Sequence, residues 1–213
     1  MSAPILIMGA TSGIGALAVK EAAARGLAVR AFSRSAGGMP EQAHVERFAG
    51  DARNADDVAG ALKDVSAVIY ALGIKERLAM LWEEETLFSE STGILISAMA
   101  AADVSRLVAV TGFGAGRSRK AMSRIESMGH KAILGRPYAD KDRQEALIIQ
   151  SDLEWTIARP VILSNNAKSG RMRVLRNPDE WRNGLVSRAD VAGYLVDAVQ
   201  ESLDIRADVV LAR

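Results

Sequence analysis

The sequence contains no cysteine, which excludes disulfides, thiolate metal sites and a cysteine nucleophile. Neither sign of charge is in excess, because 27 basic residues stand against 26 acidic ones, and this argues against a basic surface for nucleic acid or membranes. No apolar run is long enough to span a bilayer, and the start lacks the features of a signal peptide. We therefore expect a cytoplasmic protein with no nucleic-acid or membrane partner and no metal site.

Histidine is also scarce, which leaves few side chains that ordinarily exchange protons near neutral pH. Only two are present. His44 precedes a predicted strand and is expected at the surface. His130 follows the fifth predicted strand, where a structural role is favoured over that of a proton donor.

The chain does have a glycine-rich turn between a strand and a helix. Residues 4–8 form a near-continuous apolar run, which is typical of a strand buried on both faces. Gly9, Gly13 and Gly15 follow at the spacing GxxxGxG, and an alanine-rich helix is predicted over 16–25. In this order, backbone N–H groups at the helix start can close on a pyrophosphate, so the sequence predicts dinucleotide binding. A side chain at Gly9 would block the tight turn. One at Gly13 or Gly15 would hold the cofactor or the strand away from the helix.

The end of the second predicted strand, over residues 27–32, carries a hydroxyl and a cation. In dinucleotide folds an acidic residue at this end selects a free 2′-hydroxyl of the adenosine ribose, whereas a cation accommodates a 2′-phosphate. Ser33 and Arg34 stand there, and no carboxylate follows before Glu41. Because arginine offers a planar fork to phosphate oxygens, we predict NADP (NADPH) rather than NAD as the cofactor. The alternative is a solvated surface arginine.

The rest of the chain alternates strands and helices. Further strands are predicted over 45–49, 67–72, 106–110, 154–159 and 208–211, with a short extra strand over 171–175. Helices are predicted over 86–102, over 137–150 and from Ser187 onward. About seven strands in this order indicate an α/β protein with a doubly wound parallel sheet, the NAD(P)-binding Rossmann fold. At 213 residues we expect one domain over 1–213, whose small substrate-side portion comes from the loops after strands four, five and six.

Three polar stretches near the strand ends each allow two interpretations. Asp51 is placed either to accept a hydrogen bond from an adenine amino group or to cap the next helix, for which Asn54 is also a cap. The loop between Gly73 and Glu85 is either a substrate-side loop or a solvated one. A basic run after the fifth strand is either an anion site or a solvated face: Arg117, Arg119, Lys120 and Arg124.

Several blocks together resemble a known family. In chain order they are the glycine turn, Arg34, Gly50-Asp51, Ala71-Leu72-Gly73, Lys141-x-x-x-Glu145, Trp155-Thr156-Ile157-Ala158-Arg159-Pro160 and Ser187-Arg188-Ala189-Asp190-Val191-Ala192. This pattern resembles the atypical short-chain dehydrogenase/reductases, the NAD(P)H-binding group related to NmrA-like proteins and biliverdin reductase B-type flavin reductases. The resemblance covers essentially the whole chain, and the lysine–glutamate and arginine–proline blocks are its most specific parts.

The resemblance implies a role for each matching position, and most of these roles are contacts to the cofactor. The pyrophosphate would be lined by Gly9, Thr11, Ser12, Gly13 and Ile14, and the 2′-phosphate by Ser33 and Arg34. The adenine would be met by Asp51 and Ala52, the ribose by Ala71 and Gly73, and the nicotinamide amide by Pro160. Lys141 matches the active-site lysine and would hold the nicotinamide ribose hydroxyls.

The sequence departs from the family patterns at two places. Its turn reads GxxxGxG, as in the catalytic short-chain dehydrogenases, whereas the atypical group usually shows GxxGxxG. Those dehydrogenases place a proton-donating tyrosine four residues before the lysine. Pro137 stands there instead, with Tyr138 one step displaced on the helix face of Lys141. Thr111 stands near the place of the catalytic serine, so the candidate catalytic residues are Thr111, Tyr138 and Lys141.

These features favour a particular class of reaction. Reduction of a ketone needs a proton donor at the developing alkoxide. Without the usual tyrosine, acceptors with a delocalised reduced anion are favoured, such as flavins, quinones or tetrapyrroles. We therefore expect an NADPH-dependent reductase of a small planar acceptor, which works mainly by holding nicotinamide against that acceptor. The alternative is an NADP(H)-binding regulatory or redox-sensor protein of NmrA-like type, without turnover, that signals to a protein partner. A nucleotide-sugar epimerase ranks below both, since too little chain follows Pro160 for a sugar-binding domain.

Overall fold

A mostly parallel sheet of eight strands runs through the centre of the protein. The computed structural model describes residues 3–73, 86–122 and 138–213. The strands of this sheet are β1 (Ile5–Met8), β2 (Val29–Ser33), β3 (Val45–Ala49), β4 (Ala67–Tyr70), β5 (Arg106–Val110), β6 (Glu154–Pro160), β8 (Arg173–Leu175) and β10 (Ala207–Ala212). Their spatial order is β3-β2-β1-β4-β5-β6-β10-β8, and among these described strands only the pairing of β8 with β10 is antiparallel. The predicted doubly wound parallel fold is therefore confirmed.

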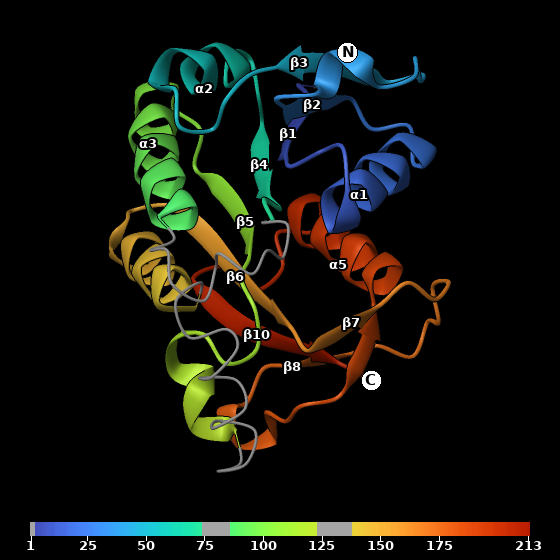
Figure 1. Cartoon of the computed structure of the whole chain (residues 1–213), viewed down its shortest axis with the longest axis vertical. Helices are drawn as coiled ribbons and strands as arrows, with labels where there is room; N and C mark the ends of the chain where they lie inside the picture. The colour runs from blue at the N-terminus through green and yellow to red at the C-terminus, as the bar shows by residue number, and fades with distance from the viewer. Residues whose placement is uncertain (1–2, 74–85, 123–137) are drawn as a thin grey trace.

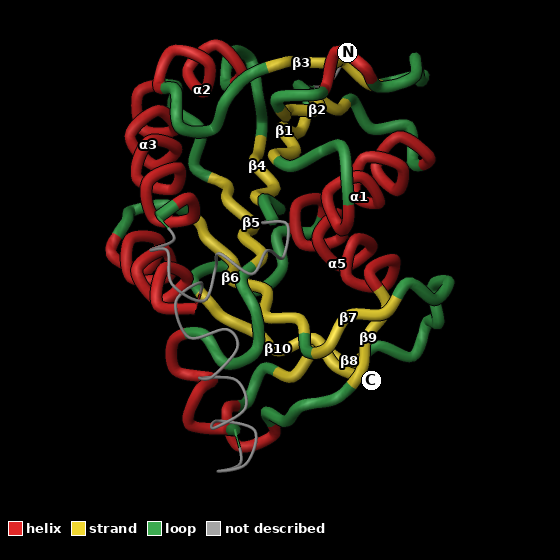
Figure 2. The backbone as a smooth tube through the Cα atoms, viewed as in Figure 1, coloured by secondary structure: helices red, strands yellow, loops and turns green. Residues whose placement is uncertain are grey.

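Helices cover both faces of this sheet (Figures 1 and 2). On one side lie α1 (Gly13–Ala24) and α5 (Arg188–Gln200), and on the other α2 (Ala55–Ala61), α3 (Leu87–Ala101) and the helix over 138–150. Short 3₁₀ segments are η1 (Ala36–Gly38), η3 (Gly116–Ala121) and η4 (Pro178–Glu180). The chain order reverses its direction across the sheet between β1 and β4, which is the crevice where such folds bind nucleotides.

The unbroken apolar run of β1 follows from these two layers. Ile5 and Ile7 join the core under α1 and α5, whereas Leu6 and Met8 join the core under α2 and α3. Successive side chains of a strand point to opposite faces, so a strand covered on both sides needs apolar residues at every position. The prediction of a buried strand there is confirmed.

Helix starts also follow the sequence. The side-chain oxygen of Asn54 accepts the backbone N–H groups of Asp56 and Asp57, so the predicted cap of α2 is confirmed. Ser187 caps α5 by accepting the N–H of Asp190 at 2.9 Å. The Asp190 carboxylate itself accepts the backbone N–H groups of Ser169 and Gly170, and thereby ties the loop before β8 to the start of α5.

The structure differs from the expected strand count at one place. A second sheet of two parallel strands, β7 (Ile162–Ser164) and β9 (Leu185–Ser187), was not predicted. Each strand has three residues, which is too short for an alternating pattern, and Ile162 and Leu185 are 60% and 49% exposed. The short extra strand expected over 171–175 is β8.

Charged side chains occupy both outer strands of the large sheet. Glu46 and Arg47 of β3 and Arg173 of β8 are exposed. His44, just before β3, is exposed as predicted, while His130 and the loop over 74–85 fall outside the described residues. None of the helices that the structure describes is long and apolar enough to cross a membrane.

Candidate functional site

The glycine turn joins β1 to α1 at the carboxyl edge of the sheet. Gly9 has a φ of +82°, and a Cβ added to it would lie 2.5 Å from the carbonyl oxygen of Ala71. A Cβ added to Gly15 would overlap the carbonyl oxygen of Gly9. Backbone approaches backbone at both positions, so a side chain at Gly9 would block the turn and one at Gly15 would push the helix away from it.

Gly13 is a different case, because its missing side chain faces open space. Its φ is +56°, and within the part of the chain that the structure describes no atom lies within 4 Å of the position a Cβ would take. Ser12 makes no side-chain capping hydrogen bond, and the first turn of α1 holds no acidic side chain. The first N–H groups of a helix have no partner within the helix and carry partial positive charge. These residues therefore fit a bound phosphate, with Thr11 and Ser12 exposed beside it and Ile14 buried beneath.

The end of β2 lies beside this turn, because β2 borders β1. Ser35 Oγ donates to Thr11 Oγ1 at 3.1 Å, and Ser33 Oγ accepts the backbone N–H of Ser35 at 3.2 Å. The Arg34 side chain is exposed and forms no hydrogen bond or ion pair with any part of the chain that the structure describes. Hydroxyls and an uncommitted guanidinium next to the phosphate-fitting turn suit a further anionic group.

The predicted adenine and ribose positions border the same edge. Asp51 Oδ1 accepts the N–H of Arg53 at 3.0 Å, and its own N–H donates to Asp57 at 2.8 Å. The cap of α2 is Asn54, so the interpretation of Asp51 as that cap is wrong. Ala52 is buried, Ala71 is half-buried with its N–H on the carbonyl oxygen of Met8, and Gly73 is exposed.

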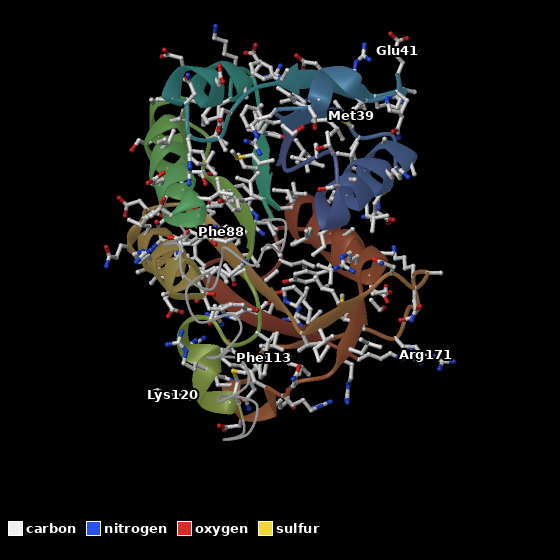
Figure 3. The ribbon with its side chains drawn as sticks, in the orientation of Figure 1. Met39, Glu41, Phe88, Phe113, Lys120 and Arg171 are labelled. Carbon is white, nitrogen blue, oxygen red and sulfur yellow. The ribbon has the colours of Figure 1, made fainter. Side chains whose placement is uncertain are left out.

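The three candidate catalytic residues come together at the end of β5. Lys141 Nζ donates to the carbonyl oxygen of Thr111 at 2.8 Å and lies 4.3 Å from the ring centroid of Phe88. Figure 3 labels Phe88 at the start of α3, next to the helix that carries Lys141. Tyr138 also reaches β5, since a Cβ on Gly112 would lie 2.7 Å from its hydroxyl oxygen. The i, i+3 spacing of Tyr138 and Lys141 thus delivers both to one place.

Burial changes the proton affinity of two of these groups. Loss of water around the Lys141 ammonium lowers its pKa from 10.5 to about 8, although Glu145 and Asp140 act in the opposite direction. Burial raises the pKa of the Tyr138 hydroxyl to about 12, and the charge of Glu145 adds to this rise. At neutral pH the lysine is therefore mostly charged and the tyrosine protonated.

Glu145 joins the two most specific blocks of the sequence. Its Oε1 accepts the Thr111 hydroxyl at 2.7 Å and Arg159 Nε at 3.0 Å, and its Oε2 accepts Arg159 Nη2 at 2.7 Å. The Thr111 proton is thus directed at Glu145. Glu145 and Arg159 are both buried, and their side-chain contact is bidentate.

The ion-pair cluster continues to the last strand of the sheet. Asp208 of β10 pairs with Arg159 and also accepts Arg117 Nε at 2.7 Å. The guanidinium carbons of Arg117 and Arg159 lie 5.1 Å and 5.3 Å from the ring centroid of Trp181. Asp208 and Trp181 were not predicted from the sequence, although it contains one signal for Asp208. An arginine inside a buried strand needs a carboxylate, and Asp208 is the acidic residue of the closing apolar strand.

The basic run after β5 is now partly explained. Arg117 pairs with Asp208, and Arg119 pairs with Asp142, which also accepts the N–H of Gly116 at 2.7 Å. These contacts attach η3 to the sheet and to the helix over 138–150. Arg124 and Pro137 lie outside the described residues.

Pro160 ends β6 at the same edge of the sheet. It is buried, and its carbonyl oxygen accepts the N–H of Phe113 at 3.0 Å, which links the ends of β6 and β5. Among residues 3–73, 86–122 and 138–213 there is no cluster of side chains that could hold a metal ion. The edge therefore places the glycine turn at the end of β1 and Lys141 at the end of β5, with β4 between them.

Comparison with known families identifies the family of the chain. The sequence pattern of the family described as NAD(P)H-binding matches residues 9–202. The chain belongs to the NAD(P)H-binding family. The resemblance to the atypical NAD(P)-binding short-chain dehydrogenase/reductase group is thereby confirmed. No curated protein matches the sequence.

Solved structures of similar fold agree with membership of the NAD(P)H-binding family. ChuY, an anaerobilin reductase from Escherichia coli O157:H7, is 25% identical with a TM-score of 0.79, over 98% of this chain and 96% of that one. A putative exported protein from Burkholderia pseudomallei is 27% identical with a TM-score of 0.76, over 99% of each chain. A short-chain dehydrogenase/reductase from Veillonella parvula in complex with NADP is 16% identical with a TM-score of 0.83, over 100% and 95%. This last likeness shows the fold alone.

Proposed function

We propose that this member of the NAD(P)H-binding family is an NADPH-dependent reductase that transfers hydride to a small planar acceptor, such as a flavin, a quinone or a tetrapyrrole. The observation that carries the proposal is the placement of Lys141 at the end of β5, on the same edge as the glycine turn. β1 and β5 are two strand spacings apart, or about 10 Å. A dinucleotide held at the turn would extend across β4 toward the lysine. The likeness to an anaerobilin reductase supports reductase activity.

Different residues at this edge of the sheet would bind different parts of the cofactor. N–H groups at the start of α1 would hold the pyrophosphate, approached closely because Gly13 has no side chain. Ser33 and Arg34 would hold the 2′-phosphate and so select NADPH over NADH. The remaining contacts follow the family roles, with Asp51 and Ala52 at the adenine, Ala71 and Gly73 at the ribose, and Pro160 at the nicotinamide amide.

Lys141 would orient the reacting end of the cofactor. Its ammonium has three donors, and one of them is used on the carbonyl oxygen of Thr111. The others suit the hydroxyls of the nicotinamide ribose. The bound cofactor supplies the hydride, and the lysine fixes the direction in which it is delivered.

Proton supply decides the class of acceptor. The Thr111 hydroxyl donates to Glu145, and burial keeps the pKa of Tyr138 at about 12, too high for an efficient acid at neutral pH. An acceptor whose reduced anion is delocalised does not need a positioned donor, because solvent can protonate it. The edge therefore suits planar conjugated acceptors better than ketones.

The Thr111 hydroxyl donates its proton to Glu145 and not toward a substrate. The same observation therefore favours the second candidate, an NADP(H)-binding sensor without turnover. One experiment separates the two. Oxidation of NADPH is followed at constant protein with a panel of flavins, quinones and linear tetrapyrroles, beside a fluorescence titration of NADPH binding. Turnover of any acceptor, abolished in Lys141→Met, supports the reductase. Micromolar binding with no turnover on the whole panel supports the sensor. An absence of binding contradicts both.

A further inference from the structure

Lys141 and Glu145 stand one helical turn apart, yet they do not pair. An ammonium and a carboxylate at i, i+4 on a helix ordinarily attract each other. Here Lys141 forms no ion pair with any described residue, and Nζ donates to the carbonyl oxygen of Thr111 instead. Both side chains reach the same threonine, since Glu145 accepts the Thr111 hydroxyl at 2.7 Å. The spacing along the helix therefore does not explain why Lys141 and Glu145 form no ion pair.

Arg159 binds the Glu145 carboxylate, with which Lys141 would otherwise pair. Its Nε lies 3.0 Å from Glu145 Oε1 and its Nη2 lies 2.7 Å from Oε2, so it binds both oxygens. With the Thr111 hydroxyl on Oε1 as well, the carboxylate already accepts three hydrogen bonds. A planar guanidinium fork matches a carboxylate in this way, whereas a lysine ammonium is a point charge.

The rest of the cluster fixes Arg159 in that position. Its side chain has no exposed surface, and Nη1 pairs with Asp208, which Arg117 holds from η3. Gly116 has a φ of +52°, and a Cβ there would overlap Glu145 Oε2, so the chain leaves room for the pair. Arg159 therefore cannot release Glu145 without leaving two buried carboxylates poorly matched.

We propose that Arg159 is a positioning residue for Lys141, because it binds both oxygens of Glu145 and so keeps that carboxylate from drawing the ammonium away from the end of β5. The ammonium then retains donors for a ligand at this edge. This inference rests on the proposed function only in naming that ligand as the hydroxyls of the nicotinamide ribose. The contacts on the protein side are independent of it.

Other charges near Lys141 are also committed elsewhere. On the same helix, Asp140 accepts the N–H of Phe88 at 2.8 Å, and Tyr138 carries a protonated hydroxyl at neutral pH. The charged groups from the other elements of the cluster are Arg159 of β6, Asp208 of β10 and Arg117 of η3. Glu145 is thus the carboxylate whose release would change the environment of Lys141 most.

The test measures Lys141 directly. Protein labelled with ¹³C at lysine Cε is titrated from pH 6 to 11 by NMR, and the Lys141 signal is assigned by its loss in Lys141→Arg. In Arg159→Met, Glu145 is expected to capture the ammonium and raise the pKa of Lys141 by at least about one pH unit. The double variant Arg159→Met/Glu145→Gln is expected to bring that pKa back to the wild-type value or below. Arg176→Met, which removes an arginine paired with Asp204, is the matched control and leaves the titration unchanged.

A merely structural role predicts something else. If Arg159 only supports packing, its loss exposes Lys141 to water, and Glu145→Gln lowers the Lys141 pKa no more in the Arg159→Met protein than it does alone in the wild-type background. That result would overturn the proposal. If Arg159→Met does not fold, Arg159→Lys decides, because a single ammonium cannot bind both oxygens of Glu145 in the way the guanidinium does. A rise in the Lys141 pKa in that variant supports the proposal, and an unchanged pKa overturns it.

NADPH affinity, measured by titration in the same proteins, connects this inference to the proposed function. We expect about a tenfold loss in Arg159→Met and recovery in the double variant, as for one hydrogen bond to a charged group. If wild-type protein binds NADPH but reduces no acceptor, the reductase proposal fails while both readouts still test Arg159. If affinity fails to recover although the pKa does, Arg159 does not position Lys141 for this ligand.

Discussion

The carboxylate of Asp140 accepts the backbone N–H of Phe88 at 2.8 Å and thereby joins the helix over 138–150 to the start of α3. Asp140 is fully buried, and it also accepts the N–H of Ser89 at 3.3 Å, so it satisfies donors that the first turn of α3 cannot pair by itself. The same contact places the Phe88 ring beneath the Lys141 ammonium. One aspartate therefore stabilises the scaffold next to the candidate site.

Replacement of Asp140 by alanine should lower the free energy of unfolding by about 1–3 kcal/mol, because the capping carboxylate is lost and buried donors remain unpaired. Urea unfolding at pH 7 measures this change. Glu41→Ala is the control, since it removes the same charge from an exposed position (Figure 3) and should change stability by less than about 0.5 kcal/mol. Equal effects of the two substitutions would contradict the assigned role of Asp140.

From the lowered pKa of Lys141 we predict that the free energy of unfolding depends on pH above neutrality. Between pH 8 and 10.5 the unfolded chain holds the lysine proton and the folded chain has lost it, because burial lowers the folded pKa to about 8. Stability contributed by this residue therefore rises with pH across that window, by up to about 3 kcal/mol. Lys141→Met has no such group. Urea midpoints of both proteins without cofactor should show an advantage of the methionine variant at pH 7 that shrinks toward pH 10.5. A constant difference would mean that Lys141 keeps its ordinary pKa.

Replacement of Gly13 by alanine should mainly weaken cofactor binding, whereas replacement of Gly15 by alanine should mainly lower stability. At Gly13 the new methyl group meets no atom of the described residues, so the cost to stability is that of a left-handed backbone, about 1–2 kcal/mol. The methyl group would also narrow the space that we propose for the pyrophosphate. We expect NADPH affinity to fall at least about tenfold, or 1.4 kcal/mol. At Gly15 the methyl group would overlap backbone, and stability should fall by at least about 2 kcal/mol. Gly37→Ala, with open space and no positive φ, controls for the added methyl group in both assays.

Arg34→Ala should remove the preference for NADPH over NADH without destabilising the fold. A charge-assisted contact to a 2′-phosphate contributes about 1.5–3 kcal/mol, so NADPH should bind about 10- to 100-fold more weakly while NADH affinity stays constant. Arg171→Ala is the matched control, because Arg171 is an exposed arginine that lies just before β8 (Figure 3). If NADPH and NADH lose affinity equally, Arg34 does not read the 2′-phosphate.

Tyr138→Phe tests whether a protein group supplies the proton. With a planar acceptor, we expect kcat to change by less than about threefold, since solvent protonates the product. A positioned acid would contribute about a hundredfold or more. The comparison is made at several pH values with the best acceptor of the panel, and a large loss of kcat at unchanged KM would assign Tyr138 the donor role.

Local sequence patterns were sufficient for most of the elements in the sheet. The strand predicted over 106–110 is β5 without change, because a buried run there is bounded by polar residues on both sides. Asn54 was a readable cap, because a helix start depends on a few neighbouring residues. The strands β7 and β9 were not predicted. Each has three residues, too few for a periodic pattern, and the two strands are separated by 20 residues of chain.

The candidate site was predictable as a set of blocks and not as a set of contacts. Lys141, Glu145 and Arg159 all stand in blocks that the sequence analysis used, but the contacts of these charged side chains are made with partners 14, 30 or 49 residues away. The low pKa of Lys141 likewise depends on its burial next to the Phe88 ring, which no local pattern reports. The roles assigned to the cofactor-binding residues stay predictions until NADPH binding is measured.

The charged residues on the two outermost strands have a consequence for handling the protein at high concentration. An unpaired strand border can recruit another copy and begin aggregation, and charges such as Glu46, Arg47 and Arg173 make such edge-to-edge growth costly. Variants that preserve these borders should remain well dispersed. Replacing Arg173 with valine would create a route to insoluble material even if the site itself were intact.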